Sequence, residues 1–238
     1  MRIRGQRECR SCGTRWSYYE TGSVECPSCG SPRSVGVEDE RRLHTASPVS
    51  LDLTEARNRL ESDESLREVA DVAAEACREY VRGFGFVNAG ELQYLEETYL
   101  AAMELRHVAG RVGRSMTLDD DEEFYFLSLL RGADHGDRPA SDEVPDSLRS
   151  ARGLAYARAV SEYRSDVRAY LDEHPHPLAS EVLGPLDGHL KRVVALDGEV
   201  PTAESELLVR IAQDVGTYLR EDDESALAEA RDRLDRLT

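Results

Sequence analysis

Apolar side chains recur at three- and four-residue steps along most of the chain after residue 50. This period is typical of amphipathic α-helices, because residues three and four apart share one face. We expect helices near residues 52–60, 63–83, 91–112, 117–130, 146–173, 182–194, 202–219 and 227–237. No strand-like run is apparent after residue 50. Residues 51–238 are therefore predicted to form an all-helical bundle domain.

Glycine and proline indicate where these helices should stop. Gly83-Phe84-Gly85-Phe86 should end one helix with both rings turned to the core, since it lacks the Lys and Ser or Thr of a phosphate loop. Gly184-Pro185 predicts a break in another helix. Residues 132–146 are polar and predict an exposed loop, and residues 37–50 predict a linker.

The first 36 residues show a different pattern. Cys9-Arg-Ser-Cys12-Gly13 and Cys26-Pro-Ser-Cys29-Gly30 are two Cys-x-x-Cys pairs with thirteen residues between them. Trp16 to Tyr19 is typical of a strand, Thr21-Gly22-Ser23 of a turn, and Val24-Glu25 leads back, which predicts a β-hairpin between the pairs. Cys9, Cys12, Cys26 and Cys29 are thus the candidate ligands of one tetrahedral Zn²⁺ in a small zinc ribbon.

Two alternatives use the same four cysteines. Disulfides would require an oxidising compartment, and the chain starts Met1-Arg-Ile-Arg-Gly5 without the apolar stretch of a signal peptide, so we expect reduced thiols in the cytoplasm. A rubredoxin-type iron site has the same ligand set. With either metal the role should be structural, because a module this small cannot bury enough surface alone. Four protein ligands also leave no open position for catalysis.

The paired Cys-x-x-Cys-Gly motifs resemble the zinc ribbon of transcription factor IIB type, and also rubredoxin-like ribbons. The chain as a whole resembles an uncharacterised halophilic archaeal family that places such a ribbon before a helical region. The resemblance implies metal binding and a link to transcription, and it implies no activity for the helical domain.

Composition adds an unusual charge distribution. The formal net charge is −17, and the basic residues are almost all Arg, with Lys191 the single Lys. Together with an apolar content of 40%, this indicates a folded protein adapted to a salt-rich cytoplasm. Residues 1–37 nevertheless carry +3, which leaves −20 for the remainder. This asymmetry points to nucleic-acid binding by the ribbon, with Arg10, Arg15 and Trp16 as candidate contacts.

No catalytic constellation is apparent, so we expect a non-enzymatic protein. Glu104 and His107 form a Glu-x-x-His pair like those of di-iron bundles, but a second such pair is missing. Cys77 lies within an apolar stripe and should be a buried core residue. The leading hypothesis is a zinc protein associated with nucleic acid or the transcription machinery. The alternative is an adaptor whose acidic helical domain binds a protein partner. No apolar run is long enough for a membrane span, so no membrane partner is expected.

Overall fold

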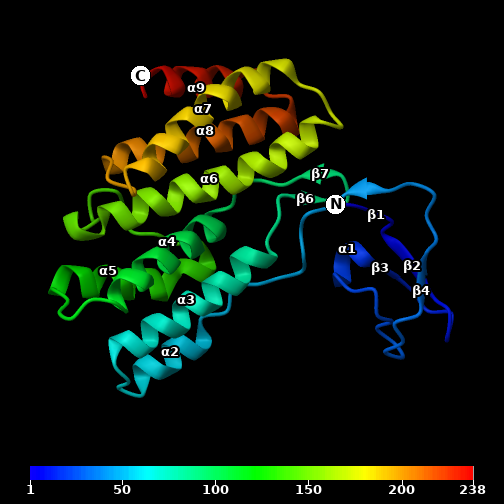
Figure 1. Cartoon of the computed structure of the whole chain (residues 1–238), viewed down its shortest axis with the longest axis horizontal. Coiled ribbons are helices and arrows are strands. Elements are labelled where there is room, and N and C mark those ends of the chain that lie inside the picture. Colours follow the sequence, from blue (N-terminus) through cyan, green and yellow to red (C-terminus); the bar gives the residue numbers. More distant parts are fainter. Residues whose placement is uncertain (238) are drawn as a thin grey trace.

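The computed structural model describes residues 1–237, and it confirms a mainly helical protein with a small N-terminal β region (Figure 1). The N-terminal elements are β1 (Arg2–Ile3), β2 (Gln6–Cys9), β3 (Arg15–Ser17), α1 (Tyr18–Thr21), β4 (Ser34–Gly36) and β5 (Arg42–Leu43). The helices that follow are α2 (Thr54–Glu61), α3 (Leu66–Gly83), α4 (Glu97–Val112), α5 (Asp120–Gly132), α6 (Arg149–Leu171), α7 (Pro177–Ala195), α8 (Thr202–Glu221) and α9 (Glu224–Asp235). Short 3-10 turns at Ala133–His135 and Asp146–Leu148 precede α6.

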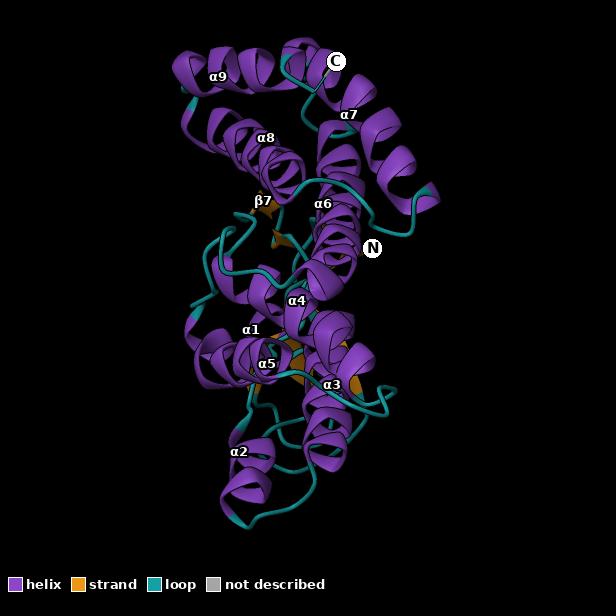
Figure 2. Ribbon diagram, turned by 90° about the vertical axis from the view of Figure 1, so that its left-hand side faces the viewer, coloured by secondary structure: helices purple, strands orange, loops and turns teal. Residues whose placement is uncertain are grey.

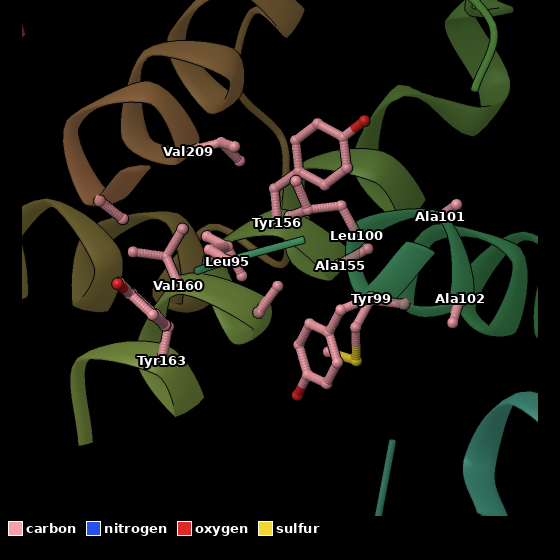
Figure 3. Close-up of a cluster of buried hydrophobic side chains, with 14 of the residues drawn as sticks. Leu95, Tyr99, Leu100, Ala101, Ala102, Ala155, Tyr156, Val160, Tyr163 and Val209 are labelled. Carbon is pink, nitrogen blue, oxygen red and sulfur yellow. The ribbon is translucent and has the colours of Figure 1, made fainter. Parts of the chain in front are cut away.

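The helices form two groups, which contact each other through α4 of the first group and α6 of the second (Figures 1 and 2). Helices α2, α3, α4 and α5 pack together in the first group, and α7, α8 and α9 pack with α6 in the second. The shared core contains the buried rings of Tyr99 of α4 and of Tyr156 and Tyr163 of α6 (Figure 3). Within residues 1–237 no helix is both long and apolar enough to cross a bilayer.

Local sequence explains where several helices begin and which face they bury. Ser65 and Glu68 form a capping box at the start of α3, and Asp119 and Glu122 form another at α5. Each box satisfies backbone N–H groups that the first helical turn cannot pair. The predicted stripe of α3 is confirmed, since its members from Val69 to Tyr80 are buried.

Two expectations for the helical part are wrong. Helix α7 continues through Pro185 from Pro177 to Ala195, so there is no break at Gly184-Pro185. Proline removes one helical hydrogen bond there, while Arg164 Nε donates to the Leu183 carbonyl of the same turn at 2.9 Å. Two short strands, β6 (Val87–Asn88) and β7 (Glu91–Leu92), also occur after residue 50. They are too short for a two-residue alternation to show in the sequence.

The predicted hairpin between the two cysteine pairs is also wrong. The sheet has the order β3-β2-β4, with β2 antiparallel to both neighbours, so the first cysteine pair lies inside the β2–β3 hairpin. Tyr18 and Tyr19 belong to the helical turn α1, which ends at Gly22 with φ of 61°. Tyr19 is held by its hydroxyl, which donates to the Ile3 carbonyl at 3.0 Å, and by its ring against Gly5.

The chain after the sheet is tied to both parts of the molecule. Strand β5 pairs with β1, and Leu43 is buried in the helical core. The next residue, His44, lies with its ring 5.0 Å from that of Tyr19 and accepts a hydrogen bond at Nδ1 from Ala89 N–H. Thr45 Oγ1 then donates to Asp166 of α6 at 2.6 Å. These contacts hold the N-terminal module against the β6–β7 turn.

Candidate metal centre

Each Cys-x-x-Cys pair forms a tight turn with the same backbone bonds. Gly13 N–H donates to the Cys9 carbonyl at 3.0 Å, and Gly30 N–H donates to the Cys26 carbonyl at 2.8 Å. Both glycines have positive φ, 76° and 68°, which explains why Gly follows each pair. We call these two turns, residues 9–14 and 26–31, the first and second knuckles. Strand β2 positions the first knuckle by supplying Cys9 as its last residue.

The two knuckles bring the four sulfur atoms together. All four Sγ atoms lie within 4.8 Å of one another, with 3.7 Å between Cys9 and Cys29 and 3.6 Å between Cys12 and Cys26. For Zn–S bonds of about 2.3 Å, the edge of a sulfur tetrahedron is about 3.8 Å. Disulfide bonds would need about 2.05 Å, and all five cysteines of the chain are free. The geometry therefore matches four thiolates around one metal ion.

Neighbouring polar groups favour the thiolate forms of the first cysteine pair, Cys9 and Cys12. The backbone N–H of Cys12 is the main cause that lowers the pKa of Cys9. The hydroxyl of Thr14, 3.2 Å from Cys12 Sγ, and the Thr14 N–H lower the pKa of Cys12 to about 6. Ser11 N–H also points to Cys9 Sγ at 3.3 Å. Cys9 and Cys26 are buried, while Cys12 and Cys29 face solvent, so a metal could enter from that open side.

Trp16 does not have the position that base stacking requires. Its side chain is only 7% exposed, it packs with Cys9 and Cys26, and its Nε1–H donates to the Ser23 carbonyl at 3.1 Å. The ring therefore covers the buried side of the cysteine cluster, which leaves little of it exposed for contact with a base. From the sequence alone, a tryptophan that covers the cysteines cannot be told from one that stacks on a base.

The candidate arginines are exposed but differ in their partners. Arg15 Nε donates to Glu8 at 2.6 Å, so its charge is already paired. Arg10 is exposed, and its backbone N–H bonds to the carbonyl of Arg33 at 2.8 Å, which brings a second exposed arginine beside it. Within residues 1–237 neither Arg10 nor Arg33 has a carboxylate partner. Arg33, which our sequence reasoning did not select, comes close only because β4 pairs with β2.

The Glu104–His107 pair does not form part of a metal site. The carboxylate of Glu104 accepts hydrogen bonds from the hydroxyls of Tyr125 and Tyr156, while His107 Nδ1 lies 2.8 Å from the Met103 carbonyl. Across residues 1–237, the four cysteines are the only group of three or more His, Cys, Asp or Glu side chains placed to share a metal. Cys77 is fully buried in α3, and burial raises the pKa of its thiol to about 12.

Comparison with known proteins adds a family but no activity. No curated protein and no solved structure matches the chain. One family model covers nearly all of it, from residue 1 to residue 234, so the cysteine cluster and the helical region belong to a single family unit. The chain is accordingly a member of a family of unknown function (DUF7117).

Proposed function

We propose that this protein is a non-enzymatic zinc-binding protein whose N-terminal module is a zinc ribbon of transcription factor IIB type. The observation that carries the proposal is the close approach of four Sγ atoms at the separations of a zinc–thiolate tetrahedron. Cys9, Cys12, Cys26 and Cys29 would hold the ion, which would join the two knuckles and stabilise the module. Iron suits the same ligands, and metal analysis of the purified protein separates the two.

The proposed partner is nucleic acid or the transcription machinery, reached through the ribbon in a salt-rich cytoplasm. Support comes from the charge of +3 on residues 1–37 against −20 on the remainder, and from the neighbouring exposed side chains of Arg10 and Arg33. Because Trp16 is buried, this contact would consist of arginine–phosphate pairs without base stacking. Such binding is independent of base sequence and weakens steeply with salt.

Binding of labelled DNA and RNA to the zinc-loaded protein, measured by fluorescence anisotropy over a range of salt, tests this proposal. Arg10→Glu with Arg33→Glu should weaken binding at least tenfold and reduce the salt slope by about 2, which corresponds to two lost phosphate contacts. A matched control makes the same charge change elsewhere, with Arg41→Glu and Arg67→Glu. Absence of binding by the unaltered protein, or equal loss in both variants, would exclude the ribbon as a nucleic-acid contact.

A second candidate is a protein–protein adaptor whose zinc is purely structural. Three aromatic residues of the ribbon are used in internal packing, Trp16 beside the cysteines and Tyr18 and Tyr19 against His44. The adaptor role would place the partner on the acidic helical domain. Cross-linking of the full-length protein in cells, followed by identification of the cross-linked residues, distinguishes contacts through α2–α9 from contacts through the knuckles.

A further inference from the structure

A cavity of about 460 Å³ lies between α3, α4 and α6, beside the segment that leaves the ribbon. Its size is in the range of about 300–1,000 Å³ that small-molecule sites occupy. Arg78 and Arg82 line it from α3, and Arg106 lines it from α4. Arg78 and Arg82 are four residues apart, so they project from the same face of their helix. Three arginines thus line one cavity in the acidic part of the chain.

Two of these arginines have no partner of opposite charge. Arg78 lies beside Glu75, but within residues 1–237 no carboxylate pairs with Arg82 or Arg106. Arg106 is half-buried, where a guanidinium gains most from a bound anion. Arginine presents a planar set of donors that fits phosphate oxygens in pairs. The arrangement is suited to a phosphate or diphosphate group.

Two carboxylates and an aromatic ring also line the cavity. Asp166 of α6 is held in place by Thr45 Oγ1 at 2.6 Å and Phe86 N–H at 2.7 Å, and both donate to its Oδ2 atom. Its Oδ1 atom has no partner among residues 1–237, and Glu162 lies one turn earlier on the same helix. Carboxylate oxygens accept hydrogen bonds from hydroxyl groups, as they do from ribose in nucleotide sites.

Phe84 completes the wall and is fixed by its neighbours. Its ring centroid lies 5.0 Å from that of Tyr99 and 5.1 Å from that of Phe86, and the side chain is half-buried. The Gly83-Phe84-Gly85-Phe86 segment therefore contributes an aromatic surface to the cavity. Gly85 allows this placement, because a side chain there would collide with the backbone of Thr45.

We propose that this cavity binds a phosphorylated small molecule that carries hydroxyl groups, a nucleotide or a sugar phosphate. The phosphate contacts Arg78, Arg82 and Arg106, and the hydroxyls face Glu162 and Asp166. A base, where the ligand has one, packs on Phe84. This site is separate from the metal centre and does not depend on nucleic-acid binding by the ribbon.

Isothermal titration of the full-length, zinc-loaded protein with pyrophosphate, ribose 5-phosphate and ADP tests the proposal. Arg82→Gln with Arg106→Gln should raise the Kd at least tenfold, while Arg67→Gln with Arg111→Gln, on the same two helices but outside the cavity, should change it less than twofold. Glu162→Gln should weaken ribose 5-phosphate and leave pyrophosphate unchanged. Arg82 is exposed, so Arg82→Gln alone provides the test if the double variant does not fold.

Several outcomes would overturn the assignment. One is that none of the three ligands binds. Another is that the cavity variant and the control variant have equal affinity. A third is that only an oligonucleotide binds. An affinity for ribose 5-phosphate that does not change in Glu162→Gln would contradict the role of Glu162. Arg10→Glu with Arg33→Glu should leave this affinity unchanged, so failure of the ribbon proposal and failure of this one are distinguishable.

Discussion

Arg152 of α6 places its Nη1 atom 3.5 Å from Oε1 of Glu104 on α4, and these side chains are 2% and 0% exposed. The carboxylate also accepts from Tyr156 Oη at 2.7 Å and from Tyr125 Oη. Arg152 in turn donates to the Pro139 carbonyl at 3.0 Å and to Glu206 of α8. This buried network joins the two helical groups at the point where α4 meets α6.

Removal of the arginine from this network should be costly. Arg152→Leu leaves Glu104 buried without its cation, and breaking a buried pair in this way typically costs about 3–5 kcal/mol of unfolding free energy. Tyr125→Phe removes two hydrogen bonds, the one that the hydroxyl donates to Glu104 and the one that it accepts from Arg152 Nη1 at 3.1 Å, and should cost about 1–3 kcal/mol. Arg149→Leu, on the same helix, breaks an exposed pair with Asp146 and should cost less than about 1 kcal/mol. Urea denaturation measures all three, and equal losses for Arg152 and Arg149 would contradict the role of the network.

The purified protein should contain one zinc ion per chain. Cys26→Ser with Cys29→Ser should abolish metal binding, while the helical region keeps its circular dichroism, because its core is a separate cluster from that of the cysteine module. Cys77→Ala should retain the metal. In the unaltered protein, a thiol reagent applied with a chelator should label four cysteines while the protein is folded. It should label Cys77 only after unfolding. Labelling of five thiols under native conditions would argue against the buried position of Cys77.

The two knuckle glycines should be sensitive to a side chain. Gly30 has φ of 68°, where Ala costs about 1 kcal/mol, so Gly30→Ala should weaken zinc affinity roughly fivefold in a competition titration with a chelator. Gly184→Ala is the matched control. This glycine lies inside α7 with open space around it, and Ala there should stabilise the protein by up to about 1 kcal/mol. A loss of stability at Gly184 would show that its environment is more crowded than described.

His107 should make stability depend on pH. Burial lowers its pKa from 6.5 to about 4, so the unfolded chain takes up a proton between these values before the folded protein does. Stability is therefore fully present above about pH 6.5 and is lost progressively as pH falls toward 4, by up to about 3 kcal/mol. His107→Gln should lose less than the unaltered protein between pH 7 and pH 4 in urea denaturation. Parallel losses in the two proteins would exclude this histidine as the cause.

Low salt should destabilise the helical region. The remainder of the chain beyond residue 37 carries −20, and carboxylate repulsion grows as screening is removed. Circular dichroism and thermal unfolding from molar salt to a few millimolar measure the effect. A melting temperature that does not change across this range would contradict adaptation to a salt-rich cytoplasm.

The sequence alone determined the features that depend on short-range order. Helix periodicity is a property of neighbouring residues, so the apolar stripe of α3 could be predicted before any packing was known. The cysteine cluster could be predicted for the same reason, because each Cys-x-x-Cys turn places two sulfurs by local geometry. The effect of Pro185 was predicted wrongly, because α7 continues through it in spite of the lost hydrogen bond. Strands β6 and β7 were missed, because their pairing and not their local sequence defines them.

Only the tertiary structure decided which side chains meet across elements. Trp16 covers buried cysteines instead of facing solvent, and Arg33 lies beside Arg10, because strand pairing in the sheet sets both positions. Glu104 meets Arg152, 48 positions further along the chain, and not His107, three positions away. Arg106 joins Arg82 around one cavity because α3 packs on α4. Such pairings depend on how helices and strands pack, and one chain's residue pattern does not contain that information.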